Sequence, residues 1–437
     1  MDRYVSAIRS ASFVQRLGHV TRLSGLLVES AGPDCAVGQV CLLRDAATSR
    51  SVKAEVVALR AGCVVLMPYG EIAGIGLDWE VVATTSASEI VPVGPELLGR
   101  VIDAFGESLD GRPRPATSCV GSLKGQPINP LARAPIHTVL ETGVRAIDSM
   151  LTLGRGQRVG IFAGSGVGKS TLLGMVSRQV QADVNVIALI GERGREVKEF
   201  IEKNLGPEGL KKSVVVAATS EQPAAARIRA AHAATAIAEN FREGGKDVLL
   251  VMDSVTRLAM ARREVGLAVG EPATARGYTP SVFAELPRLV ERCGTSGSGG
   301  SITALYTVLV DGDDMNDPVA DTMRSLLDGH IVLSRQLANQ GHYPAIDVLQ
   351  SVSRLLPDLA SEPELQVVRS AVAALAAYEK NKEMIDMGMY RAGTSPMIDR
   401  ATRLAPQIHQ LLKQDIRASY GRADTMKTLA TLVGSKA

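Results

Sequence analysis

Aromatic residues are scarce in this chain of 437 residues, where Phe, Tyr and Trp together account for 3%. The core must therefore be built mainly from Val, Leu, Ile, Met and Ala. Neither sign of charge is in excess, because 48 Lys and Arg residues balance 46 Asp and Glu residues and leave a formal net charge of +2. So balanced a chain lacks the broad positive surface that attracts nucleic acid, and we expect no nucleic-acid partner.

Cysteine is also rare: Cys35, Cys41, Cys63, Cys119 and Cys293 are scattered and form no Cys-x-x-Cys pair. This pattern favours reduced thiols that pack as small apolar groups over a disulfide framework or a metal site. No apolar run approaches the roughly 20 residues of a membrane span. Arginines at positions 3, 9 and 16 interrupt the N-terminal residues, so a signal peptide is not predicted. We expect a cytoplasmic protein.

The hydrophobic pattern divides the chain into four segments. Residues 1–18 have the apolar spacing of a short helix, and a frayed terminus is an equal alternative. Residues 19–90 contain short β-rich runs separated by Gly, Pro and Asp, which predict a small barrel or sandwich. Residues 91–360 begin with a Pro- and Gly-rich connection and continue with apolar runs that alternate with helical segments, as in an α/β domain with a parallel sheet. Residues 361–437 show helical patterns alone.

The strongest motif is AGSGVGKST, which follows the apolar run VGIF. Glycines leave backbone N–H groups free to face a phosphate, and the next helix directs its positive end at the anion. The strict pattern begins with Gly where this chain has Ala163, but the terminal GKST disfavours a merely structural turn. The predicted nucleotide-binding residues are Gly164, Ser165, Gly166, Val167, Gly168, Lys169, Ser170 and Thr171. Lys169 would meet the β- and γ-phosphates, and the Ser170 hydroxyl would ligate Mg²⁺.

Acidic residues follow two other apolar runs. Asp253 ends the run DVLLVMD, where a carboxylate can orient the hydration shell of Mg²⁺, so it is the second predicted metal residue. Glu192 and Arg193 come after VNVIALIG. A carboxylate at the end of the strand that neighbours the phosphate-loop strand can polarise the attacking water. By position alone, a solvated charged run that opens a helix is an equal alternative for these two residues.

The segment HYPAIDVLQSVSR contributes two further candidates. Tyr343, which precedes Pro344, could stack on a purine ring. Arg354 could stabilise transition-state charge in the site of an adjacent subunit. A single arginine is more often a surface or salt-bridge residue, so these assignments need the context of the whole chain.

Taken together and in this order, the motifs resemble the family of flagellar protein-export ATPases. The stretches that carry the resemblance are TGVRAIDSMLTLGRGQRVGIFAGSGVGKSTLLGMVSR, GERGREVKEFIEKNLGPEGLKKSVVVAATS, VLLVMDSVTRLAMARREVGLAVGEP and GSITALYTVLVDGDDMNDPVADTMRSLLDGHIVLSR. The resemblance extends from about residue 18 into the C-terminal part. The same stretches also resemble the type III secretion ATPases and, beyond them, the catalytic subunits of rotary ATP synthases.

The resemblance implies an N-terminal six-stranded β-barrel, a RecA-like P-loop NTPase core and a C-terminal helical domain, assembled as a homohexameric ring with active sites between subunits. It implies ATP as the substrate and Mg²⁺ as the metal. Glu192 then polarises water with Arg193 beside it, and Asp253 joins the metal site. Tyr343 lines the adenine pocket, and Arg354 is the arginine finger given to the next subunit.

The function that the resemblance implies is Mg²⁺-dependent ATP hydrolysis that energises flagellar type III protein export by unfolding and releasing chaperone-bound substrates. A virulence-type secretion ATPase is the nearest alternative, and a rotary proton-coupled ATP synthase subunit is a less favoured one. A ring helicase is disfavoured because residues 19–90 contain only Tyr69 and Trp79 as aromatic residues, too few to stack bases.

The resemblance also implies partners and a location. We expect export-apparatus regulator and stalk proteins and chaperone–substrate complexes to bind, the stalk and the chaperones at about residues 365–437. From Arg400 onward, Lys and Arg outnumber Asp and Glu, which is compatible with an acidic partner but also with a solvated surface. Residues 264–272 would face the central channel of the ring. The expected location is cytoplasmic, peripheral at the inner face of the cell membrane.

Overall fold

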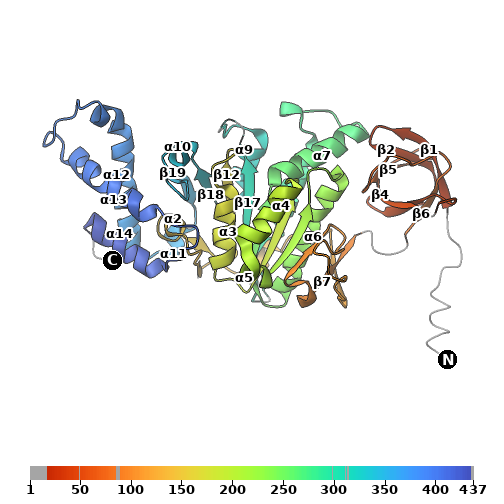
Figure 1. The fold of residues 1–437 in the computed structure, drawn as a ribbon, viewed down its shortest axis with the longest axis horizontal. Helices are drawn as coiled ribbons and strands as arrows, with labels where there is room; N and C mark the ends of the chain where they lie inside the picture. The colour runs from red at the N-terminus through yellow and green to blue at the C-terminus, as the bar shows by residue number, and fades with distance from the viewer. Residues whose placement is uncertain are drawn as a thin grey trace.

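The computed structural model of the chain describes residues 17–48, 50–84, 89–297, 299–310, 312 and 314–434. A small β-barrel, a large α/β unit and a group of helices follow one another in chain order along the long axis (Figure 1). The helix expected within residues 1–18 lies outside the described residues, except that Leu17 and Gly18 open the first strand. Within the described ranges, no helix is long and apolar enough to cross a membrane.

The N-terminal unit is a closed barrel, which decides between the barrel and the sandwich that the sequence allowed. The strands are β1 (Leu17–Ser24), β2 (Leu27–Ala31), β3 (Val40–Arg44), β4 (Ser51–Arg60), β5 (Cys63–Pro68) and β6 (Glu80–Ala83). They pair in the order β1-β2-β5-β4-β3-β6, with β6 closing onto β1. Because side chains alternate between the two faces of a strand, apolar residues such as Val28, Leu43 and Leu66 fill the interior.

A connection rich in Pro and Gly wraps from the barrel onto the α/β unit. Its elements are β7 (Ile90–Val93), η1 (Pro95–Leu97), β8 (Arg100–Ile102), β9 (Cys119–Ser122), η2 (Pro130–Ala132), β10 (Val139–Leu140), α2 (Arg145–Met150) and β11 (Leu153–Gly154). β7 pairs with β9, and β8 adds an edge strand to the main sheet. The connection is therefore part of the α/β unit and not a free linker.

The main sheet contains the five apolar runs that the sequence assigned to buried parallel strands, together with further strands that the sequence did not assign. Its principal strands are β12 (Arg158–Ala163), β13 (Val184–Ile190), β14 (Ser213–Ala218), β15 (Asp247–Asp253), β17 (Ser301–Leu309), β18 (Gly329–Leu333) and β19 (Ile346–Ser353). They lie in the order β19-β18-β12-β17-β15-β13-β14-β8, and the short β16 (Gly294–Thr295) pairs with β17. β19 and β16 run antiparallel, whereas the strands from β18 to β8 are parallel. Residues that follow the parallel strands therefore meet at one edge, which we call the carboxyl edge.

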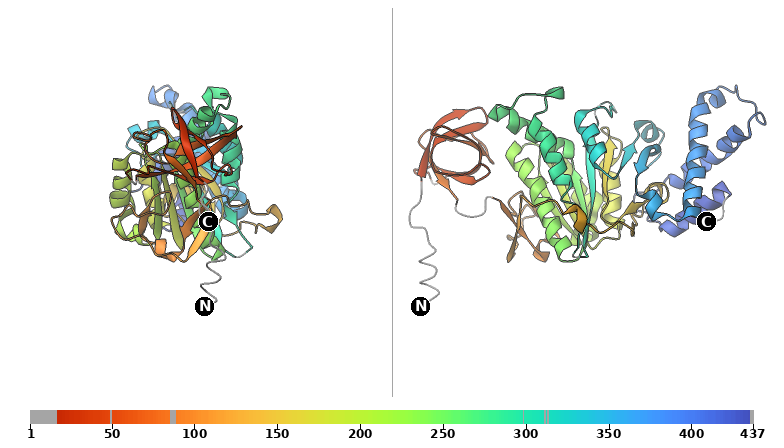
Figure 2. Two further views of the ribbon diagram at one scale, coloured as in Figure 1. Left: turned by 90° about the vertical axis from the view of Figure 1, so that its right-hand side faces the viewer. Right: turned by 180° about the vertical axis from the view of Figure 1, so that it is seen from behind.

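Helices cover both faces of this sheet, and each face has its own apolar core. The helices are α3 (Lys169–Gln179), α4 (Gly194–Glu199), η3 (Phe200–Leu205), α5 (Gly206–Lys211), α6 (Ala224–Glu243), α7 (Val255–Val269), η4 (Ala275–Gly277), α8 (Pro280–Val290), α9 (Pro318–Leu326), α10 (Arg335–Asn339) and α11 (Leu356–Leu359). Figure 2 shows α6 and α7 on the side of the sheet that leads to the barrel. There Val65 and Met67 of the barrel pack against Ala225 and Val265 of these helices.

The C-terminal helices are α12 (Glu362–Asp386), α13 (Pro396–Leu412) and α14 (Arg422–Val433). They lie at the end opposite the barrel, as the views with the long axis horizontal show (Figure 1 and the right panel of Figure 2). Their apolar residues, including Val367, Leu404 and Leu429, belong to the same core cluster as Leu172 of α3. The helical unit packs against α2 and β19. Arg178 and Gln179 at the end of α3 also donate hydrogen bonds to the carbonyls of Ile416 and Ala418, which follow α13.

Candidate active site

The glycine-rich loop joins β12 to α3 at the carboxyl edge of the sheet. Gly168 is the N-cap of α3 and has a φ of +92°, a left-handed conformation that residues with a Cβ adopt only with strain. Because α3 begins at Lys169, the unpaired N–H groups of its first turn and its positive end face the loop. This arrangement suits phosphate groups.

Lys169, Glu192 and Asp253 converge beside this loop although they are far apart in sequence. Lys169 Nζ lies 3.2 Å from Glu192 Oε1 and forms an ion pair with the Asp253 carboxylate. All three side chains are mostly buried, and that of Asp253 is only 3% exposed. The Thr307 hydroxyl donates to Asp253 Oδ1 over 2.7 Å, so the neighbouring strand β17 fixes the orientation of this carboxylate.

Glu192 follows the expected strand, but that strand has a different place in the sheet. The sequence predicts that the strand before Glu192 neighbours the phosphate-loop strand. The sheet order β12-β17-β15-β13 instead places β17 and β15 between them. Glu192 still reaches Lys169 because parallel strands bring their following residues to the same edge.

The protonation of this cluster is shifted by burial and by the close carboxylates. Burial and the charge of Asp253 raise the pKa of Glu192 to about 7, against the opposing charge of Lys169. Burial alone would lower the pKa of Lys169, but Asp253 and Glu192 raise it, so the ammonium stays charged. A carboxyl group with a pKa near neutrality can accept or release a proton under ordinary conditions, as general acid–base chemistry needs.

The donors present here fit Mg²⁺. A small cavity is lined by Ser170, Glu192, Glu196 and Asp253, together with the apolar Leu189, Val197 and Phe200. The cavity has three carboxyl groups, whereas Lys169 supplies a single positive charge, so a cation is favourable there. Oxygen donors of this kind are the ligands that Mg²⁺ prefers. In the described part of the chain, no three acidic, His or Cys side chains are arranged to hold a metal by themselves. Mg²⁺ in a phosphate-loop site needs no such cage, because substrate phosphates and water complete its shell.

Tyr343 lies against the end of the phosphate loop. A Cβ placed on Gly168 would lie 3.5 Å from Tyr343 Cε1, so the ring and the loop are in contact distance of each other. The side chain remains accessible, since the residue is 44% exposed. Its backbone carbonyl accepts a hydrogen bond of 2.9 Å from the amide of Gln414, which follows α13. A segment of the helical unit therefore holds this tyrosine in place.

Arg193 is not part of the buried cluster. It is the N-cap residue of α4, and its side chain is 79% exposed. Its guanidinium lies 2.9 Å from Glu196 Oε1, so it approaches the site only through that carboxylate.

Arg354 lies at the opposite edge of the sheet, which we call the amino edge. It follows Ser353, which pairs with Gly329 at the start of β18, and its amide donates to Asp328 O over 3.0 Å. The adjacent strand β12 runs from this edge to the phosphate loop, a rise of about 17 Å at roughly 3.3 Å per residue. The structure therefore separates Arg354 from the loop of its own chain.

Sequence reasoning missed two residues at this site. Glu196 lines the cavity with Glu192 and shares a hydrogen bond with it, which lowers the pKa of Glu196. Arg257, in the first turn of α7, packs against Gly191, and its buried Nε has no hydrogen-bond partner. The signals were present in GERGREV and MDSVTR, where a charged residue lies four positions beyond Glu192 and Asp253.

Three family models match consecutive parts of the chain. The beta-barrel domain of the ATP synthase alpha/beta family matches residues 20–85, and its nucleotide-binding domain matches residues 143–353. The C-terminal domain of the type III secretion ATPase EscN matches residues 360–431. Among curated proteins, the flagellum-specific ATP synthase of Bacillus subtilis is 51% identical over 99% of this chain and 98% of its own length. The type 3 secretion system ATPase of Sinorhizobium fredii is 47% identical over 91% of this chain and 88% of its own length.

Solved structures give the same result. The assembled ATPase EscN of enteropathogenic E. coli superposes with a TM-score of 0.90 at 41% identity, over 95% of this chain and 100% of that chain. EscN in complex with its central stalk EscO superposes with a TM-score of 0.87. The β-barrel, the α/β unit and the C-terminal helices are thus all shared with these proteins. By sequence and by fold, the chain belongs to the ATP synthase alpha/beta family and, within it, to the flagellum-specific and type 3 secretion ATPases.

Proposed function

We propose that the chain hydrolyses ATP in an Mg²⁺-dependent reaction. The observation that carries this proposal is the buried cluster of Lys169, Glu192 and Asp253 beside the phosphate loop. Lys169 neutralises phosphate charge, and the amides of residues 164–171 bind phosphate oxygens. Glu192 orients the attacking water and accepts its proton. Ser170 and Asp253 would hold Mg²⁺, which supplies charge neutralisation at the β- and γ-phosphates.

The active unit of this proposal is a homohexameric ring. Arg354 lies at the amino edge, so it can meet a nucleotide only when the amino edge of one chain faces the carboxyl edge of the next. Head-to-tail contacts of that kind close into rings. The similarity to the assembled EscN ATPase supports this arrangement. Arg354 then supplies the guanidinium that stabilises the transition state, and the barrel (19–90) and the ATPase domain (91–360) form the body of the ring.

The process that we propose hydrolysis to serve is flagellar type III protein export. Five flagellum-specific relatives match at 46–51% identity over at least 96% of this chain, which supports this setting. A virulence-type secretion ATPase is the second candidate, because a type 3 secretion system ATPase matches at 47% identity. In either setting the C-terminal helices (361–437) meet a central stalk, by analogy with the complex of EscN and its central stalk EscO. The same helices also meet chaperone–substrate complexes. The export regulator would attach the ring to the inner face of the cell membrane.

The catalytic part of the proposal is tested by paired substitutions. Lys169→Ala should weaken ATP binding as well as turnover, because it removes a charge that faces phosphate. Glu192→Gln should still bind ATP, while turnover falls by about 10² or more. Glu199→Gln is a matched control, because Glu199 lies on α4 but is exposed and pairs with Lys203. A Glu192→Gln protein that hydrolyses ATP at the normal rate would refute the assigned role.

The cellular setting is tested separately. Proteins that co-purify with the chain from its own cells should include flagellar stalk and export chaperones. Recovery of virulence-type partners alone would favour the second candidate and leave the catalytic proposal intact.

A further inference from the structure

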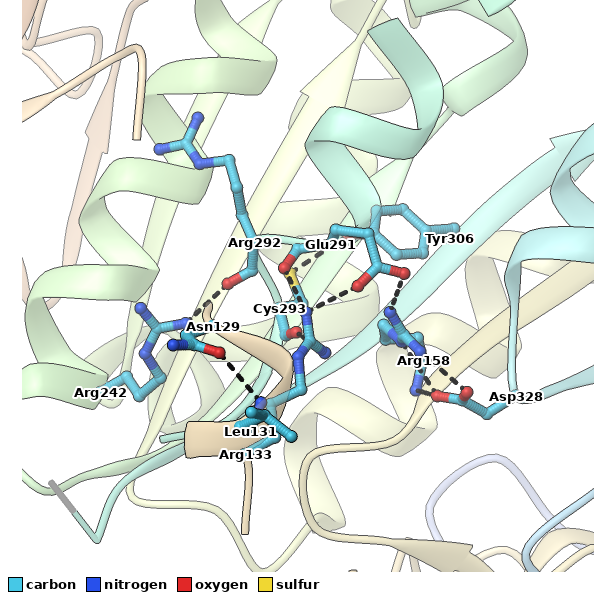
Figure 3. Close-up of polar contacts among 10 residues, drawn as sticks. All are labelled: Asn129, Leu131, Arg133, Arg158, Arg242, Glu291, Arg292, Cys293, Tyr306 and Asp328. Carbon is cyan, nitrogen blue, oxygen red and sulfur yellow. Dashed lines mark hydrogen bonds and ion pairs between the residues drawn. The ribbon is translucent and has the colours of Figure 1, made fainter. Parts of the chain in front are cut away.

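The backbone around Arg354 belongs to a rigid ion network at the amino edge. The Arg354 amide binds Asp328 O, and the Asp328 carboxylate accepts two hydrogen bonds of 3.0 Å from Nε and Nη2 of Arg158. Arg158 also reaches Glu291 Oε1 over 2.6 Å, and Glu291 in turn binds Arg133 (Figure 3). The side chains of Arg158 and Asp328 are 14% and 24% exposed, so the contact between these two residues is largely shielded from water. Arg354 therefore extends from a fixed position.

A second arginine, Arg324, is presented at the same place. It lies in the last turn of α9, and its backbone carbonyl accepts a hydrogen bond of 3.2 Å from Arg354 Nη2. A guanidinium is favourable there because the C-terminal end of a helix carries partial negative charge. This contact places the guanidinium of Arg354 directly beside the residue from which the Arg324 side chain extends.

The side chain of Arg324 is available for another partner. It is 40% exposed, and its acidic contact is Asp321 Oδ1 at 3.2 Å, one helical turn earlier. Asp321 is itself 69% exposed, and exposed pairs of this kind contribute little to stability. Arg324 can therefore exchange this carboxylate for a phosphate, for which a guanidinium has good geometry.

Positive charge accumulates at this point of the surface. Burial and then the charges of Arg324 and Arg354 lower the pKa of His330, whose Nε2 lies 3.0 Å from Gln350 O. The carboxylate of Asp328, which precedes β18, is already bound by Arg158. An anion that approaches Arg354 therefore enters a region in which the charges of Arg324 and Arg354 act together.

We propose that Arg324 is a second catalytic arginine, which each chain supplies together with Arg354 to the phosphates of the nucleotide bound by the next chain. The proposal rests on the proposed function, since it needs ATP at the carboxyl edge of a neighbouring chain. Phosphoryl transfer spreads negative charge over several oxygens, so two guanidinium groups can stabilise it better than one. Arg354 is held by the backbone of Arg324, so the two groups reach the nucleotide as a unit.

The first experiment measures ATP turnover by rings whose assembly is checked by light scattering. Arg324→Ala should lower kcat by about 10- to 100-fold, and Arg324→Lys should recover part of the rate because it restores the charge. Arg369→Ala is a matched control, because Arg369 is also an exposed arginine with one exposed acidic partner, Glu362, and lies on α12. Binding of a fluorescent ATP analogue to dissociated Arg324→Ala chains should stay unchanged, since the chain's own phosphate site is intact.

The second experiment asks whether Arg324 acts on the neighbouring chain. Rings mixed from Arg324→Ala and Glu192→Gln chains should regain activity, because some interfaces combine an intact Glu192 with an intact Arg324. Rings in which the Glu192→Gln chain also carries Arg324→Ala should not regain it. This difference cannot arise from a structural role of Arg324 within its own chain.

The outcomes separate this inference from the proposed function. If Arg354→Ala lowers kcat while folded, assembled Arg324→Ala rings turn over at the normal rate, the role of Arg324 is refuted and that of Arg354 stands. Failure of the mixed rings to recover activity, in rings shown to contain both chains, also refutes it. If Arg354→Ala rings are fully active, the proposed intersubunit site itself is wrong.

Discussion

Gln414 connects the helical unit to the nucleotide site, and its replacement by alanine should affect both stability and ATP binding. The residue is 7% exposed. Its side-chain Nε2 donates to Gly143 O and to Ala418 O, each over 2.7 Å, and its Oε1 accepts from the amide of Arg145 over 3.0 Å. Its own amide donates to the carbonyl of Tyr343.

The magnitude follows from these contacts. Each net hydrogen bond contributes about 1 kcal/mol, and a buried group left without a partner adds about 1–3 kcal/mol. Gln414→Ala should therefore destabilise the chain by about 3 kcal/mol. At an unfolding entropy of roughly 2.1 cal/mol/K per residue, this lowers Tm by about 3 °C in a chain of 437 residues. Stacking of an aromatic side chain on a base contributes about 1–3 kcal/mol. Partial loss of order at Tyr343 should therefore weaken ATP binding by about tenfold.

The assay combines thermal unfolding with titration of a fluorescent ATP analogue. Gln410→Ala is the control, because Gln410 lies in the last turn of α13 and is exposed. A loss of stability below about 1 kcal/mol would show that these hydrogen bonds do not anchor the segment. A full loss of stability with unchanged ATP affinity would refute the link from Gln414 to Tyr343.

Three further predictions concern other parts of the chain. Gly168→Ala should weaken ATP binding at least about tenfold in the same titration, because φ is +92° and a side chain there is strained. ATPase activity should rise more steeply than linearly with protein concentration, since in the proposed ring each site takes Arg354 from another chain. A linear rise of activity over the concentration range of assembly would contradict this. Burial, together with the charge of the nearby His409, lowers the pKa of His342 from 6.5 to about 4. Between these two pH values the unfolded chain binds more protons than the folded chain, so the free energy of unfolding falls as the pH drops. The free energy of unfolding should therefore fall by about 1 kcal/mol less between pH 7 and pH 5 in His342→Gln than in the unchanged chain, after allowance for solvent screening. Urea unfolding midpoints at the two pH values measure this difference.

The sequence alone predicted five buried strands of the main sheet and the position of the phosphate loop. The glycine loop and Lys169 could be placed because the motif is local, and strand, loop and helix follow one another without a gap. The buried strands were predictable for a similar reason, since a continuous apolar run reports a strand covered on both faces. The resemblance to export ATPases supplied roles for Glu192 and Arg354 that periodicity could not.

Tertiary structure decided which strands and which side chains become neighbours in space. Strand order is set by pairing between distant segments, which leaves no local signal, so the place of Glu192 beyond β17 and β15 was not predictable. The same holds for Glu196 in the cavity and for Gln414 against Tyr343. Because β19 runs antiparallel to β18, Arg354, which follows β19, lies at the amino edge and away from the phosphate loop of its own chain. Motifs and resemblance name the candidate residues, whereas only the register of the sheet shows that Arg354 and the phosphate loop of one chain lie at opposite edges.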